Sequence, residues 1–451
     1  MLHLPKKSSV LTQSRYEPLG LKDLPFPTVP VVDPYSPDPR RNGIIYAKSP
    51  MRAEIDKFER LLIRPDDFLN RVRLAYLWAK GDQQQGRGMG KTALLRYFRQ
   101  RINKDWGLTE FAGQFSAVVI YVAFPGQVDR RYMEQLALSA LVDICKNGVL
   151  DASRAALRLS ALTEEQAAAV LKNQDGSENP ANLLDDAILQ ANGITPASLD
   201  EKITKRLMEE GVQPATAMAL AQGALEKYLC SFRKDGNLVP FYVPRDTKIL
   251  DYSRTLLFND MVYYLRAAGF AGGYLFIDDI ENLVDQMTRK QRIEFAKEFG
   301  LCTVRPGYAN TAYSFLSCVL STHYSSALPL AQAWSEAGLS TIARLDPASP
   351  NSVELPLPSK DQAREIIVAH LDHYRINPAD EGTIKPFTED GIDALLKKLH
   401  PRDLLASAAN VILRAEEVGV TNIDATFVNA AVDTAVSMST PDFTEGIDSA
   451  L

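Results

Sequence analysis

Apolar runs alternate with amphipathic stretches along most of this chain. Continuous apolar segments at 74–79, 115–124 and 274–277 predict strands that are covered on both faces. Two further strands are expected at 314–323 and 352–358. Helical periodicity fills the intervals between them, and strands separated by helices indicate a mostly parallel sheet packed between helices. The expected fold class is therefore α/β.

The same pattern divides the chain into segments. Residues 1–45 are rich in proline and predict an extended arm, which needs either its own core or a neighbouring subunit to lie on. The sheet domain is expected over 46–357. Within it, 150–246 has a helical pattern too long for one crossover and is interpreted as an insertion that binds a partner or only stabilises the core. A helical domain is expected over 358–437, followed by a polar, acidic tail at 438–451.

Charge and composition narrow the function classes. The net charge of −6 excludes a globally basic nucleic-acid binder and leaves room for a local basic strip. No stretch of about 18 apolar residues and no signal peptide occur, so we expect no membrane partner and a cytoplasmic location. The helical pair His370 and His373 predicts a solvated face rather than a metal site. Two basic groups are each either a solvated helix face or a nucleic-acid strip: Arg96, Arg99, Arg101 and Lys104, and Arg289, Lys290 and Arg292.

A glycine-rich segment follows the first predicted strand and opens a helix. It consists of Gly86, Arg87, Gly88, Met89, Gly90, Lys91 and Thr92. Glycines let backbone N–H groups cradle phosphate oxygens at the positive end of a helix. We expect Lys91 to reach the β- and γ-phosphates and the Thr92 hydroxyl to ligate Mg²⁺. The strict P-loop pattern has glycine at position 85, where Gln85 predicts a slightly reshaped loop entrance. ATP and Mg²⁺ are therefore the predicted cofactors.

Two aspartates end the apolar run that begins at Tyr274. Asp278 and Asp279 lie at the carboxyl end of this predicted strand. Parallel sheets bind their ligands at the carboxyl ends of their strands. Asp278 is expected to hold Mg²⁺ through water, and Asp279 to polarise the attacking water. A glutamate is usual at the second position. Because aspartate is one methylene shorter, slow hydrolysis is predicted. Capping of the next helix is the structural alternative and is compatible with this role.

Together these motifs resemble the AAA+ superfamily, in the branch of origin-recognition, initiator-type and transposition ATPases. The aspartate pair is also similar to STAND signalling ATPases. The resemblance covers residues 41–437. It implies an AAA+ core with a helical lid domain and three further site residues. They are Thr322 as a sensor of the γ-phosphate, Arg344 as an arginine finger and Arg402 as a second, nucleotide-binding sensor.

The resemblance implies an ATPase that assembles with its own copies into a ring or filament. One interpretation is a nucleotide-dependent switch or machine acting on DNA, RNA or a complex that acts on them. The alternative is a protein-binding regulatory ATPase of a bacterial defence (antiviral) or signalling complex, which recruits an effector through its helical insertion. A protein-remodelling motor is the third class, and no convincing aromatic–glycine pore loop is found for it.

Overall fold

The computed structural model divides into two compact units. We call Met1–Ala53, Arg87–Tyr97 and Pro356–Leu451 the helical unit, and Glu54–Gly86 and Phe98–Leu355 the sheet unit. The structure describes residues 14–30, 36–63, 71–79, 88–123, 132–173, 175–223, 233–234, 237–238, 250–305 and 315–438.

The sheet unit is built on five parallel strands in the order β2-β5-β6-β1-β7. Their bounds are β1 Leu74–Ala79, β2 Ala117–Ala123, β5 Gly272–Asp278, β6 Leu316–His323 and β7 Ser352–Leu355. The predicted α/β class and parallel sheet are thereby confirmed. Strands β1 and β6 are neighbours in the sheet. The chain leaves β1 toward β2 at one edge of the sheet and leaves β6 toward β7 at the other edge, so the connections after these two strands run in opposite directions. In parallel sheets the point between two such strands is where ligands bind.

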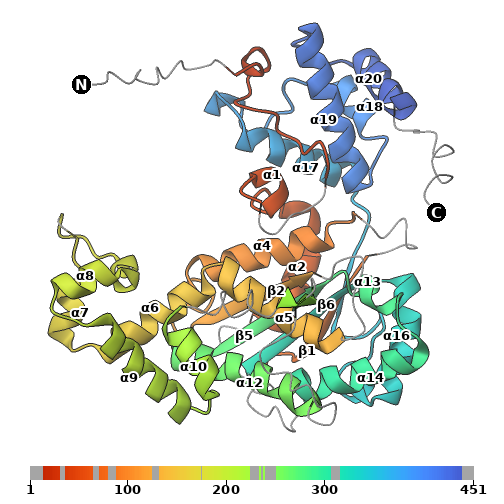
Figure 1. The fold of residues 1–451 in the computed structure, drawn as a ribbon. Helices are drawn as coiled ribbons and strands as arrows, with labels where there is room; N and C mark the ends of the chain where they lie inside the picture. Colours follow the sequence, from red (N-terminus) through yellow and green to blue (C-terminus); the bar gives the residue numbers. More distant parts are fainter. Residues whose placement is uncertain are drawn as a thin grey trace, which may run out of the picture. The chain divides into compact units, whose positions relative to one another are not determined.

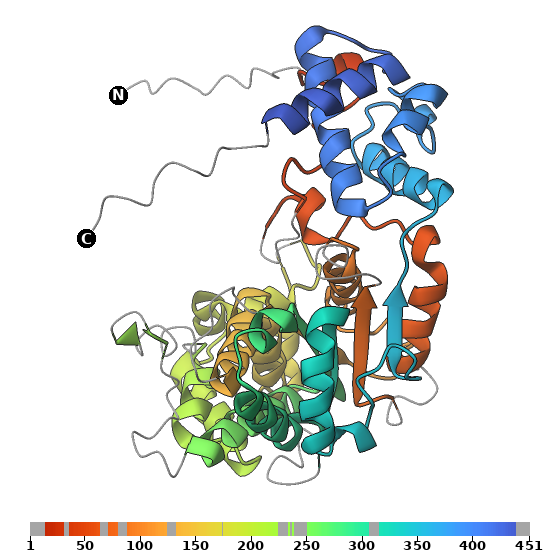
Figure 2. The ribbon, with the colours of Figure 1, turned by 90° about the vertical axis from the view of Figure 1, so that its right-hand side faces the viewer.

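Helices cover both faces of the sheet (Figure 1). On one face, Phe58 of α2 (Arg52–Leu62) stacks on Phe98 of α4 (Lys91–Lys104) and meets Phe276 edge-on. On the other face, Trp334 of α16 (Tyr324–Glu336) donates to the Tyr76 hydroxyl at 2.8 Å. Figure 2 shows α2 and α16 on opposite sides of β1 and β7. The helices α5 (Tyr132–Lys146), α12 (Leu250–Ala267) and α14 (Arg289–Phe299) complete this unit's core.

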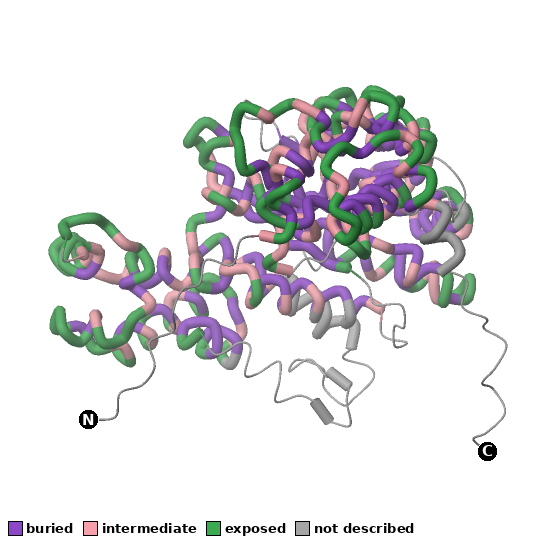
Figure 3. Tube along the Cα trace, turned by 90° about the horizontal axis from the view of Figure 1, so that it is seen from above, coloured by how far each residue is buried: buried purple, intermediate pink, exposed green. Residues whose placement is uncertain are grey.

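Among the described residues of the predicted helical insertion there are five α-helices. They are α6 (Val149–Ala161), α7 (Glu164–Leu171), α8 (Asp186–Ala191), α9 (Pro196–Glu209) and α10 (Pro214–Ala221). Arg158 is fully buried among them and pairs with Asp186 at 3.0 Å and Asp200 at 2.9 Å. The outer turns of these helices are exposed (Figure 3). Later in this interval, β3 (Arg233–Lys234) and β4 (Asn237–Leu238) pair antiparallel, while the expected turn at 235–236 and residues 239–249, with the apolar piece 239–244, lie outside the described residues.

The helical unit has a core of its own. It contains α17 (Lys360–His373), α18 (Glu389–Leu395), α19 (Pro401–Val418) and α20 (Ala425–Met438). Leu21, Leu24 and Phe26 of the proline-rich arm are buried in that core, so the described part of the arm lies on its own chain. The predicted solvated face is wrong for His370, which is buried with Nδ1 3.1 Å from the Pro25 carbonyl. Among the described helices of the chain, none is both long and apolar enough to cross a membrane.

Candidate nucleotide-binding site

The P-loop glycines of the helical unit adopt the backbone that an anion cradle requires. Gly88 has φ +81° and Gly90 φ +93°, a region that side chains disfavour. Helix α4 begins directly afterwards at Lys91, and its first N–H groups have no partner within the helix. Lys91 is buried, with 6% of its surface exposed. A Cβ placed on Gly90 would meet no heavy atom within 4 Å, so its backbone borders open space. Here a phosphate oxygen can approach.

Gly88 packs against the start of α19 within the same unit. A Cβ on Gly88 would stand 2.7 Å from Arg402 Cβ, 2.9 Å from Arg402 Nε and 2.9 Å from His400 Cε1. Only glycine fits both this space and this φ. The predicted loop and the predicted second sensor are therefore in direct contact, although more than 300 residues separate them in the sequence.

The hydrogen bonding of the Arg402 guanidinium indicates whether these residues suit a nucleotide. Its Nε is buried and has no hydrogen-bond partner among the described residues. A buried, unsatisfied donor costs about 1–3 kcal/mol, which an anionic acceptor removes. Beside two positive-φ glycines and a helix N-terminus, this donor fits a phosphate. Of the other predicted loop residues, Met89 is buried, Thr92 is half-buried, and Gly86 and Arg87 lie outside the described part of the chain.

A second group of predicted residues lies in the sheet unit, at the end of β5. Asp278 is fully buried, and its Oδ2 accepts a hydrogen bond from the Tyr121 hydroxyl at 2.6 Å. Its Oδ1 accepts another from the Ser321 hydroxyl. Two neighbouring strands thus fix the carboxylate. Sequence reasoning missed Tyr121, and the available signal was a phenol inside an otherwise apolar strand.

Asp279 forms a sharp turn between β5 and helix α13 (Ile280–Val284). Its φ of +52° lies in the left-handed region, which costs roughly 1 kcal/mol and which aspartate tolerates better than most residues. Its N–H lies 3.3 Å from Ser321 Oγ and 3.1 Å from Asp278 Oδ1. The turn brings the chain out of the sheet directly after Asp278 and leaves Asp279 half-buried.

Strand β6 ends in three consecutive polar residues, Ser321, Thr322 and His323. Because side chains alternate along a strand, Ser321 and His323 share the face toward Asp278 and Thr322 takes the other. Ser321, rather than Thr322, contacts Asp278. His323 Nε2 lies 3.3 Å from Glu281 Oε1, and both side chains are at most 2% exposed. This buried pair joins the end of β6 to α13.

Arg344 stands apart from the aspartates. It lies between η6 (Leu339–Thr341) and β7, is 67% exposed, and has its guanidinium 3.7 Å from the Asp346 carboxylate. β7 is three strand spacings from β5, roughly 14 Å. The carbonyl of Ala343, the neighbour of Arg344, accepts a hydrogen bond from the Tyr76 hydroxyl of β1 at 2.9 Å, and β1 is two strands away from β5. The exposure of Arg344 leaves it available to another molecule.

The four basic residues after the P-loop (Arg96, Arg99, Arg101 and Lys104) do not form a continuous strip facing solvent. Arg96 and Arg99 are buried, and Arg99 pairs with Asp143 at 2.9 Å. Arg101 pairs with two glutamates. Both interpretations offered for this group are thus wrong for Arg96 and Arg99, which belong to the protein interior, whereas Arg101 is half-buried. In the second group, Lys290 is 88% exposed and lies near a glutamate one helical turn away, as on a solvated helix face.

Comparisons with known proteins give one kind of match. No family model and no curated protein matches the sequence. Among solved structures, the fold is similar to that of the Aeropyrum pernix ORC2 protein in its ADPNP-ADP complexes. The match covers 91% of this chain and 71% of that one, with a TM-score of 0.41 and 8% sequence identity.

Proposed function

We propose that this protein binds ATP with Mg²⁺ at its P-loop and hydrolyses it as an AAA+-type switch. One observation carries the proposal. Gly88, Gly90 and Lys91 shape a cradle at a helix N-terminus, and the buried Nε of Arg402, which packs on Gly88, lacks a partner among the described residues. Positive backbone dipole and an unsatisfied cationic donor call for a multiply charged anion.

Each residue of the cradle has its own task. Lys91 binds the β- and γ-phosphates, and Arg402 holds a phosphate from the helical domain. The Thr92 hydroxyl and, through water, the Asp278 carboxylate would hold Mg²⁺, which would supply positive charge against the phosphates. Because Tyr121 and Ser321 already occupy both Asp278 oxygens, an indirect contact through water suits this carboxylate better than a direct one.

Hydrolysis needs a base for water and a positive group for the γ-phosphate. Asp279 follows Asp278 and is half-buried, so it is our choice for orienting the water. Thr322 is retained as the γ-phosphate sensor, with Ser321 as a second candidate because it already touches Asp278. Arg344 is exposed and its described ion pair is with Asp346, which favours a role in a neighbouring copy's site. A homo-oligomer follows from that role.

The charge distribution favours a protein partner over nucleic acid. Residues 150–246, the helical insertion, carry fourteen acidic and ten basic side chains, a net charge of −4 compared with −6 for the whole chain. Nucleic-acid phosphates are repelled by such a surface. Arg96 and Arg99, which could have offered positive charge to nucleic acid near the P-loop, are buried. We therefore favour a regulatory ATPase of a defence or signalling complex whose insertion recruits a protein effector.

Replacing Asp279 with asparagine tests the hydrolytic part. Asparagine has the same shape and tolerates the left-handed backbone, so Asp279→Asn should fold normally and keep its ATP affinity. Without the carboxylate, turnover should fall by 10²-fold or more, on the order of a lost general base. Phosphate release and fluorescent-ATP titration measure the two quantities. Turnover within two-fold of the native rate would remove Asp279 from the chemistry.

A further inference from the structure

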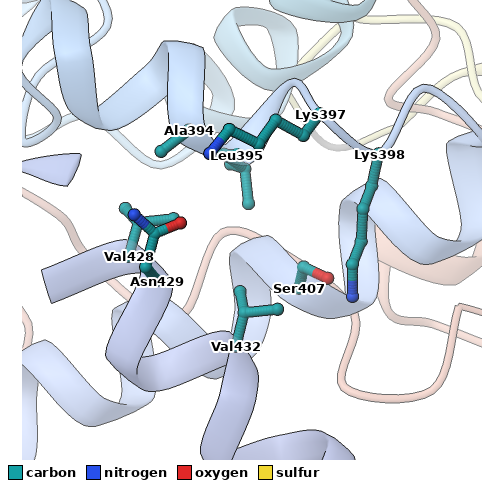
Figure 4. A pocket seen from close by; sticks show the side chains of 8 residues that line it. All are labelled: Ala394, Leu395, Lys397, Lys398, Ser407, Val428, Asn429 and Val432. Carbon is teal, nitrogen blue, oxygen red and sulfur yellow. The ribbon is translucent and has the colours of Figure 1, made fainter. Parts of the chain in front are cut away.

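A small pocket lies in the helical unit, between helices α18, α19 and α20. Its volume is about 190 Å³. It is lined by Ala394, Leu395, Lys397, Lys398, Ser407, Val428, Asn429 and Val432 (Figure 4). Leu395, Val428 and Val432 make its inner wall apolar, and the two exposed lysines stand at its rim. The pocket therefore combines an apolar interior with a positive edge.

The size of this pocket matches one aromatic ring. A protein cavity of roughly 150 Å³ with an apolar lining binds benzene. A phenyl group therefore fits here with little space left. Burial of one ring from water favours a tethered occupant and is too little to hold a free one tightly.

The chain itself supplies a matching segment immediately after α20. Residues 439–451 contain one aromatic side chain, Phe443, flanked by the acids Asp442 and Glu445. Their negative charges complement Lys397 and Lys398 at the pocket rim.

The distances allow this segment to reach the pocket. Val432 lines the pocket, and α20 ends six residues later at Met438, about 9 Å along the helix axis. The five residues from Met438 to Phe443 span up to about 17 Å when extended. Phe443 can therefore return to the pocket of its own chain, where tethering makes its effective concentration high, on the millimolar scale.

We propose that Phe443 docks in this pocket of its own chain, with Asp442 and Glu445 beside Lys397 and Lys398. The lysines lie in the turn that leads from α18 to His400 and Arg402, so a docked tail would brace the helix start that packs on Gly88. The effect on the start of α19 rests on the proposed nucleotide site, whereas the docking of Phe443 does not.

Photo-crosslinking in the full-length chain tests the docking without any nucleotide. The photoreactive residue p-benzoylphenylalanine is placed at position 443, and for comparison at 449 near the far end of the tail. Peptide mass spectrometry should find crosslinks from 443 to residues 394–398 and 428–432 of the same chain, at least five-fold more abundant than from 449. Equal yields from both positions, or none to the pocket, would overturn the proposal.

Two pocket variants show whether the crosslinks depend on the pocket. Val432→Trp fills it and should reduce them at least five-fold. Should that variant fail to fold, the charge reversal Lys397→Glu with Lys398→Glu, at exposed positions, should reduce them at least three-fold. Unchanged yields would contradict the docking. Crosslinks found only between chains, by mixing isotope-labelled and unlabelled protein, would assign the pocket to a second copy instead.

Discussion

At the scale of single residues, Gly88 and Gly90 of the P-loop differ in how much space surrounds them. Both have positive φ, so alanine strains the backbone at either position. A Cβ on Gly90 meets only open space, whereas one on Gly88 collides with Arg402 and His400. Gly90→Ala thus measures backbone strain and loss of phosphate access, and Gly88→Ala adds displacement of α19.

This difference gives a paired prediction. We expect both variants to weaken ATP binding, and Gly88→Ala also to destabilise the protein by about 1–3 kcal/mol more than Gly90→Ala, the range for overpacking. Urea unfolding with and without ATP measures both effects. Equal unfolding midpoints for the two variants without nucleotide would show that the contact between Gly88 and α19 carries no energy.

The residues of the carboxylate site show what the sequence could and could not reveal. Asp278 was predictable because an apolar run ends on it. Its partners Tyr121 and Ser321 lie 157 and 43 residues away, and they meet it only because β2 and β6 flank β5. Strand order is set by packing of the whole sheet, so local pattern could not give these contacts. It also could not show that Arg96 and Arg99 are buried.

At the scale of elements, the arm and α17 depend on each other. His370 is buried against Pro25 and Phe26, and burial lowers its pKa from 6.5 to about 4. Arg40 and His373 also oppose its protonation. The unfolded chain takes up the proton near pH 6.5 and the folded chain does so only near pH 4, so stability falls as the pH drops through this window.

His370→Asn should remove this pH dependence, because asparagine can still face the Pro25 carbonyl and carries no titrating group. Between pH 7 and pH 5 we expect the native protein to lose about 2 kcal/mol more than the variant. Urea unfolding at the two pH values, followed through the helical unit, measures the difference. Parallel losses in both proteins would place the His370 ring in contact with water.

Strands were easier to predict than the arm, for a physical reason. The run at 74–79 is apolar on both faces, and the structure has β1 over the same residues. Leu21, Leu24 and Phe26 show no period among their prolines, yet they fill the core of the helical unit. Phe26 packs against His370 of α17, and backbone hydrogen bonds join Lys22 to Tyr374 and Ile376 to Gly20. Such packing leaves no periodic signal in the sequence.

At the scale of the whole molecule, Arg344 predicts that active sites are shared between copies. Arg344→Ala should bind ATP within two-fold of the native affinity and hydrolyse it on the order of 10³-fold more slowly. Lys91→Ala lacks binding and keeps its Arg344. Mixed under conditions in which they co-assemble, the two variants should recover turnover, since some interfaces join an intact P-loop to an intact arginine.

The control for this mixture is a chain carrying both substitutions. Mixed with Arg344→Ala, the Arg344→Ala/Lys91→Ala chain cannot supply an arginine and should restore nothing. Steady-state phosphate release over a range of mixing ratios measures the recovery. A mixture of the two single variants that is no more active than its components would place Arg344 outside the chemistry or in its own site.

The central claim is that the P-loop binds a nucleotide, and Lys91 tests it most directly. Lys91→Ala removes a buried cation at the start of α4, while Lys104→Ala removes an exposed one at the end of the same helix and serves as the matched control. Titration with fluorescent ATP and Mg²⁺ should show affinity at least 100-fold weaker for Lys91→Ala and within two-fold of native for Lys104→Ala. Superimposable titration curves for the native protein and a correctly folded Lys91→Ala would contradict the account.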